Sequence, residues 1–186
     1  MPYRIIISKA KDKMNHSIEH LHHEFNGIRT GKASPTLVED IRVEAYGSNM
    51  PLKEMAGIST PESRLILIQP WDQNTVPAIV KAIQSSSLGI TPVDDGRVVR
   101  VPIPELDEER RKELDKHVKH MAEEARVVIR NIRREKNEKL KNMKKNGELT
   151  EDDLRDSEKQ MQKLTDDFIN KIGEALKHKE EEIFTI

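Results

Sequence analysis

A long amphipathic segment after residue 105 most constrains how this 186-residue chain can fold. Its apolar residues recur in alternating steps of four and three, the spacing of a helix that packs along a seam. These residues are Leu114, Val118, Met121, Ala125, Val128 and Ile132. The pattern runs on to Lys145 and Gly147, and glycine suits the left-handed residue that ends a helix. A helix over 107–145 would be ~58 Å long, so it cannot be buried along its whole length.

Two further segments predict helices that could cover this seam. In the first 30 residues, Ile7, Met14, Leu21 and Ile28 lie seven residues apart and form one apolar stripe, and we expect this helix to end near Thr30 and Gly31. From Thr150 onward, a threonine that can cap a helix precedes three acidic residues that suit its positive end. Three helices with one apolar face each can bury those faces together as an antiparallel three-helix bundle.

The middle of the chain differs in composition from both flanks. Residues 31–104 hold eight of the nine prolines, five of the eight glycines and only 15 charged residues, whereas residues 105–186 hold 42 charged residues. Short runs typical of strands occur at 41–47, 65–68 and 98–102, and an amphipathic helix is predicted over 75–86. We therefore predict an α+β protein in which residues 1–30 and 105–186 form the bundle and residues 31–104 form a small inserted β/α/β domain.

Composition and motifs exclude several classes of function. A balance of 32 basic and 33 acidic residues argues against a general affinity for nucleic acid, and we expect no DNA partner. Without cysteine, the chain has no thiolate nucleophile and no cysteine-ligated metal. There is no phosphate-binding loop, dinucleotide fingerprint or nucleophile elbow. The longest apolar run near the N-terminus, Ile5 to Ile7, is too short for a membrane span, so we expect a cytoplasmic protein without a membrane partner.

Histidines and paired carboxylates are the remaining candidates for chemistry. His16, His20 and His23 have helical spacing, as do His117 and His120, and such pairs can bind a metal. None belongs to a His-Glu-x-x-His pattern, so we favour exposed helical histidines over a metal-dependent enzyme. The acidic pairs at 94–95 and 152–153 fall where turns and helix starts favour acids anyway. We predict no catalytic residue, no metal and no cofactor.

A basic stretch is the strongest functional signal. Residues 126–145 hold nine basic and two acidic side chains, and the first four basic residues are arginines: Arg126, Arg130, Arg133 and Arg134. With ~100° between successive residues, Arg126, Arg130 and Arg133 lie within a sector of ~60° beside the seam. Planar guanidinium groups bind phosphate through two parallel hydrogen bonds, which favours contact with the backbone of folded RNA. The alternative is a solvated face that pairs with the acidic helix, where residues 148–167 hold eight acids and three bases.

An ordered set of motifs resembles the ribosome recycling factor family over nearly the whole chain. The motifs are IRTGKASP at 28–35, VEAYG at 43–47, VPIP at 101–104, EERRK at 108–112, ARVVIRNIRRE at 125–135 and QKLTD at 162–166. The resemblance implies an L-shaped molecule in which the bundle and the small domain are joined by a two-stranded hinge. Carried over by motif, the hinge would comprise Thr30, Gly31, Lys32, Pro102, Pro104 and Glu105.

The resemblance also implies a function that is not enzymatic. Such a factor binds the large ribosomal subunit and, with elongation factor G and GTP, splits the post-termination ribosome into subunits. We expect a monomer that holds ribosomal RNA through Arg29, Arg111, Arg126, Arg130, Arg133 and Arg134. A different class of function stays open on the residues alone, a helical-bundle adaptor that binds other proteins and has no role on the ribosome.

Overall fold

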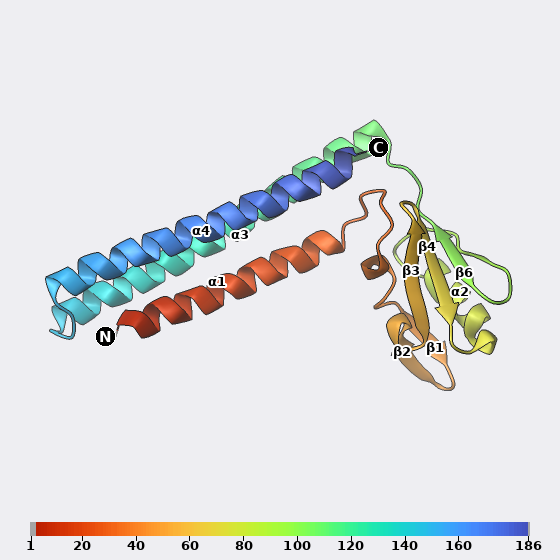
Figure 1. The fold of residues 1–186 in the computed structure, drawn as a ribbon, viewed down its shortest axis with the longest axis horizontal. Helices are drawn as coiled ribbons and strands as arrows, with labels where there is room; N and C mark the ends of the chain where they lie inside the picture. The colour runs from red at the N-terminus through yellow and green to blue at the C-terminus, as the bar shows by residue number, and fades with distance from the viewer. Residues whose placement is uncertain (1–2, 186) are drawn as a thin grey trace. The chain divides into compact units, whose positions relative to one another are not determined.

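The computed structural model describes residues 3–185 and divides the chain into two compact units (Figure 1). The bundle unit combines Met1–Phe25 with Lys112–Ile186, and the small unit is Asn26–Arg111. The boundaries at 30/31 and 104/105 expected from the sequence lie inside the small unit, which therefore also includes 26–30 and 105–111. Thr30 and Leu106, which lie in these two added stretches, are both buried.

Three long helices make up the bundle unit: α1 (Tyr3–Asn26), α3 (Glu108–Lys145) and α4 (Glu151–Phe184). In Figure 1, α3 runs opposite to α1 and α4, which confirms the antiparallel arrangement. Ion pairs join α1 to α3 through Lys13 and Glu135, and α3 to α4 through Lys119 and Glu180. Helix α4 begins at the expected cap, where the Thr150 hydroxyl accepts from the Asp153 amide and the Asp153 carboxylate accepts from the Thr150 amide.

Two details of the bundle differ from the sequence prediction. Helix α1 ends at Asn26 rather than near Thr30, and Gly27 follows directly, a residue with low helix propensity. On α3, Val128 is 44% exposed, and Ile129 occupies the seam instead. An α-helix has 3.6 residues per turn, so a seam read with a period of 3.5 drifts around a straight helix. The buried position therefore moves from residue 128 to residue 129, whereas Ile132 is buried as the sequence predicted.

The small unit contains two antiparallel sheets and one α-helix. Strands β1 (Arg42–Ala45) and β2 (Ser48–Pro51) form a hairpin, and a four-stranded sheet has the order β3 (Ala56–Glu62), β4 (Leu65–Pro70), β6 (Val99–Pro102) and β5 (Val93–Asp94). Helix α2 (Val76–Gln84) packs against them, preceded by the 3-10 helix η3 (Gln73–Thr75). Two more 3-10 helices, η1 (Pro35–Leu37) and η2 (Leu52–Glu54), flank the hairpin. The core includes Ile66 and Ile68 of β4, Val99 and Val101 of β6, and Ile79 and Ile83 of α2.

The expected α+β class is confirmed, and the small unit is richer in strands than the sequence indicated. The three predicted strands correspond to β1, β4 and β6, whereas β2, β3 and β5 were missed. Strand β3 buries only Ala56 completely and ends in exposed polar residues, so it shows no apolar alternation. Among residues 3–185, no helix combines the length and the hydropathy that a membrane span requires.

Candidate RNA-binding site on the bundle unit

Three arginines of α3 form what we call the arginine row: Arg126, Arg130 and Arg133. All three are partly exposed and flank the buried seam residues Ile129 and Ile132. Arg134, the next residue along the helix, is exposed and makes no ion pair with any other residue between 3 and 185. The four arginines that the sequence singled out on this helix therefore all reach solvent, as contact with RNA phosphate requires.

Helix α4 borders the row. The Nη1 atom of Arg133 donates to Oε1 of Gln162 at 2.8 Å, and Nε2 of Gln162 donates to Oδ1 of Asp166 at 2.8 Å. Gln162 thus fixes the Arg133 guanidinium without neutralising it. The remaining guanidinium donors of Arg133 stay available, because an arginine carries five N–H groups.

A carboxylate one turn before the row holds its other two members. Glu123 Oε1 lies 2.6 Å from Nη2 of Arg130, and Glu123 Oε2 lies 3.4 Å from Nη1 of Arg126. The hydrogen bond from Arg130 is the main reason why the pKa of the Glu123 carboxyl lies below its usual value. The sequence reasoning missed Glu123, although its spacing of three and seven residues from the two arginines was a readable signal.

Farther along α3, the lysines pair with α4 as the alternative interpretation of the sequence allowed. Lys144 lies 2.5 Å from Glu151 and Lys141 lies 3.8 Å from Glu158, both measured from Nζ to a carboxylate oxygen. The acidic start of α4 therefore neutralises part of the lysine-rich end of α3. Arg133 and Arg134, by contrast, form no ion pair with the acidic residues described in 3–185.

The structure does not gather all six predicted RNA-binding arginines on one unit. Arg29 and Arg111 belong to the small unit, and both donate to backbone oxygens within it. Arg29 Nη1 lies 2.6 Å from the oxygen of Leu88, and Arg111 Nε lies 3.2 Å from the oxygen of Leu106. Both side chains are half-buried, so they support the local fold as well as presenting charge.

The two predicted hinge segments lie side by side at one turn of the small unit. The amide of Ala33 donates to the oxygen of Ser63 at 2.7 Å, and the amide of Ile103 donates to the oxygen of Arg64 at 2.8 Å. The Arg64 side chain forms an ion pair with Glu105. The β3–β4 turn thus holds both segments with two backbone hydrogen bonds and one side-chain contact.

Gly31 brings the two segments into direct contact. Its φ of +83° lies in the left-handed region, which glycine adopts without a steric penalty. A Cβ atom built there would lie 3.5 Å from Cγ of Leu106 in the second segment. Of the other predicted hinge residues, Thr30 is buried, whereas Lys32, Pro102, Pro104 and Glu105 are exposed.

Of the candidate histidines, three pair with glutamates: His16, His20 and His120. His20 Nδ1 lies 3.3 Å from Glu24, and His120 Nε2 lies 3.4 Å from Glu124, in each case one helical turn away. Within residues 3–185, no three histidine, aspartate or glutamate side chains converge as metal ligands would. These exposed pairs contribute little to stability.

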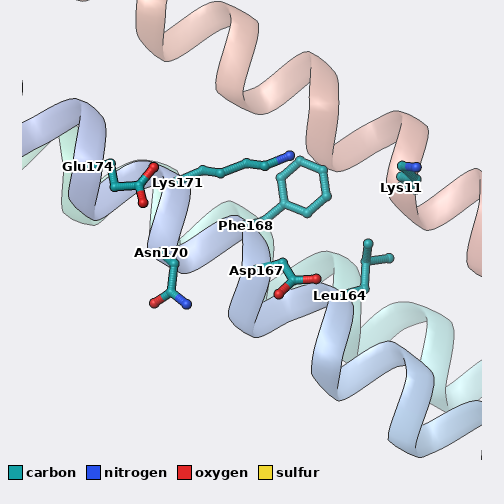
Figure 2. Close-up of a pocket in the computed structure, with 7 residues that line it drawn as sticks. All are labelled: Lys11, Leu164, Asp167, Phe168, Asn170, Lys171 and Glu174. Carbon is teal, nitrogen blue, oxygen red and sulfur yellow. The ribbon is translucent and has the colours of Figure 1, made fainter.

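A shallow groove lies between α1 and α4 of the bundle unit (Figure 2). Its centre is Phe168, whose ring lies 4.6 Å from Nζ of Lys171. Lys11, Asp167 and Glu174 also line the groove, so charges of both signs surround it. This mixed lining and the open shape do not resemble the enclosed apolar pockets that hold small molecules.

Comparison with known proteins agrees with the fold. The family described as ribosome recycling factor matches residues 21–184. A ribosome-recycling factor of Rubrobacter xylanophilus is 47% identical over 182 residues, which cover 98% of each chain. The solution structure of a ribosome recycling factor matches with a TM-score of 0.82 and 41% identity, covering 100% of this chain and 99% of the other.

A second solved structure contains a related factor together with its binding partners. It describes the T. thermophilus ribosome recycling factor and the E. coli elongation factor G bound to the E. coli post-termination complex. That factor is 43% identical, with a TM-score of 0.69, and the match covers 98% of this chain and 99% of the other. Given identity of this level from end to end, this chain belongs to the ribosome recycling factor family.

Proposed function

We propose that this protein recycles ribosomes after translation has terminated. It binds the large ribosomal subunit and, together with elongation factor G and GTP, separates the post-termination ribosome into subunits. The observation that carries the proposal is the match over nearly the full chain to relatives that bear this name, one of which was described on the post-termination complex with elongation factor G. The protein acts in the cytoplasm, as a monomer.

In this proposal the chain performs no covalent chemistry. Elongation factor G hydrolyses the GTP, and this protein transmits force between its partners. What the chain supplies is a binding surface and two units joined by two covalent connections.

The arginine row and Arg134 supply the contact with ribosomal RNA in the bundle unit. Arginine suits this role because its fork binds phosphate oxygens in pairs, and no aromatic side chain interrupts the row, so the contact is with the backbone rather than with stacked bases. Arg29 and Arg111 add contacts from the small unit through the guanidinium donors that Leu88 and Leu106 leave unused.

The two segments around Gly31 and Glu105 act as the hinge between the units. Since the β3–β4 turn holds both of them, a force applied to the small unit reaches both connections together. Pro102 and Pro104 stiffen one segment, and Gly31 provides a point of rotation in the other. Two connections restrict the movement to fewer directions than a single linker would.

The test is ribosome splitting measured by light scattering. Post-termination ribosomes mixed with the protein, elongation factor G of the same organism and GTP should scatter less light as subunits separate, and omission of any component should abolish the change. Arg133→Ala should reduce the rate and weaken binding, whereas Arg155→Ala, a matched exposed arginine on α4, should not.

Two results would contradict the proposal. A folded protein that produces no drop in scattering has no recycling activity, and binding that hardly responds to salt points to the helical-bundle adaptor instead. Phosphate contacts release counterions, so RNA binding must weaken steeply as salt increases.

A further inference from the structure

One carboxylate contacts two of the three guanidinium groups of the arginine row. Glu123 contacts Arg130 at 2.6 Å and Arg126 at 3.4 Å, with a separate oxygen for each guanidinium. The Glu123 side chain is 52% exposed, and those of Arg126 and Arg130 are 25% and 41% exposed. All three groups lie at the surface, so RNA can reach the same guanidinium donors.

A phosphate and this carboxylate compete for the same donors. The carboxylate is planar and the phosphate is tetrahedral, but both carry negative charge and both accept hydrogen bonds from guanidinium N–H groups. An RNA phosphate that approaches Arg126 and Arg130 therefore meets like-charge repulsion from Glu123. The carboxylate must rotate away before the two arginines can bind phosphate in full.

The third member of the row is not restrained in this way. Arg133 bonds to the neutral amide oxygen of Gln162, and none of the carboxylates described in residues 3–185 forms an ion pair with it. The row is therefore divided into an open position at Arg133 and two positions already occupied by an anion.

We propose that Glu123 is an internal competitor of RNA phosphate, which occupies Arg126 and Arg130 in the free protein and releases them only when RNA binds. This inference rests on the proposed RNA-binding role of the row. Its consequence is selectivity: within the row, an unrelated RNA gains the Arg133 contact at little cost and must displace Glu123 to gain the contacts with Arg126 and Arg130. The competitor lowers the affinity of the free protein for the many RNAs of the cell.

A charge-neutral substitution tests this proposal. Glu123→Gln removes the anion and keeps the size of the side chain. Its control is Glu124→Gln, which changes the net charge by the same amount but affects a carboxylate that pairs with His120 instead of an arginine of the row. The probes are an unrelated RNA duplex and large ribosomal subunits, titrated over a range of salt concentrations. Glu123→Gln should bind the duplex several-fold tighter, with a salt slope steeper by about one, and Glu124→Gln should change both much less.

A double-mutant cycle locates the effect on Arg130. In the original protein, Arg130→Ala should weaken binding to the duplex only slightly, because Glu123 already occupies that guanidinium. In the Glu123→Gln background the same change should cost several-fold more. Circular dichroism of each variant checks that the helices are intact.

The outcomes separate this inference from the proposed function. If Arg133→Ala leaves binding to subunits and duplex unchanged, the row does not bind RNA and both ideas fail. If Arg133→Ala weakens binding while Glu123→Gln behaves as Glu124→Gln does, the arginine row binds RNA but Glu123 does not compete with RNA phosphate. Weaker binding by Glu123→Gln would also reject it, since that result makes Glu123 a support for the arginines rather than a rival of phosphate.

Discussion

The Arg29 guanidinium donates to the backbone oxygen of Leu88 at 2.6 Å, across 59 residues of sequence. The contact connects the segment after α1 with the loop after α2, and both lie in the small unit. A residue assigned to RNA binding by family motif therefore also holds the fold together. Loss of activity in an Arg29 variant cannot be attributed to RNA contact unless stability is measured as well.

Arg29→Ala should destabilise the protein by about 1.5–3 kcal/mol, the range for a hydrogen bond that involves a charged group. The Leu88 oxygen loses a charged donor in a half-buried position. Chemical denaturation followed by circular dichroism measures the change. Arg42→Ala, an exposed arginine on β1, serves as the control and should stay within about 0.5 kcal/mol. Equal effects of the two substitutions would show that the Leu88 contact has no structural role.

Alanine at two glycines should change stability in opposite directions. Gly31→Ala should cost about 1–2 kcal/mol, because an L-residue is strained at a φ of +83°. Gly173→Ala, within α4 and with open space around the added methyl group, should stabilise the protein by about 0.5–1 kcal/mol. Thermal melts of both variants measure the effects. A neutral Gly31→Ala would mean that the backbone at this position readily adopts another conformation.

The turn between β5 and β6 should make stability depend on acid pH. Amide donation from Val98, together with the Arg100 guanidinium and the Arg97 amide, lowers the pKa of Asp95 to about 2. Because the folded pKa lies below the unfolded value of about 3.9, this stabilisation is complete above that value and is lost as the pH falls toward 2. Asp95→Asn should remove that part of the pH dependence, as seen in denaturation between pH 5 and pH 2. If the variant lost stability between pH 5 and pH 2 as steeply as the original protein, other carboxylates would be responsible for the loss.

Local signals in the sequence were sufficient for the helices, whereas the two compact units divide after Phe25 and Arg111 rather than at 30/31 and 104/105. Periodicity and caps predicted all three bundle helices, and the Thr150 cap is present with its reciprocal contact from Asp153. Strands β2, β3 and β5 could not be predicted in the same way. They are short or polar, and they are held by pairing with a neighbouring strand, as Val93 pairs with Arg100, rather than by an apolar pattern of their own.

For the candidate site, too, the features that depend on nearby residues could be predicted and those that depend on tertiary contacts could not. Helical geometry alone predicted that Arg126, Arg130 and Arg133 share one side of α3, since it depends only on residues close in sequence. The contacts of Arg29 with Leu88 and of Arg133 with Gln162 depend on tertiary structure and have no local signal. Glu123 is the exception, because its pairing is local and a search for acids beside the arginines would have found it.

The drift of the α3 seam gives a direct comparison between two neighbouring residues. Ile129 is fully buried and Val128 is 44% exposed, although the spacing in the sequence favoured Val128 for the core. Ile129→Ala should therefore cost about 2–5 kcal/mol through lost burial and the cavity left behind, whereas Val128→Ala should cost less than about 0.5 kcal/mol. Urea denaturation of the two variants under identical conditions compares them. A larger loss for Val128→Ala would place the seam where the 3.5-residue period puts it, and α3 would then be supercoiled rather than straight over this stretch.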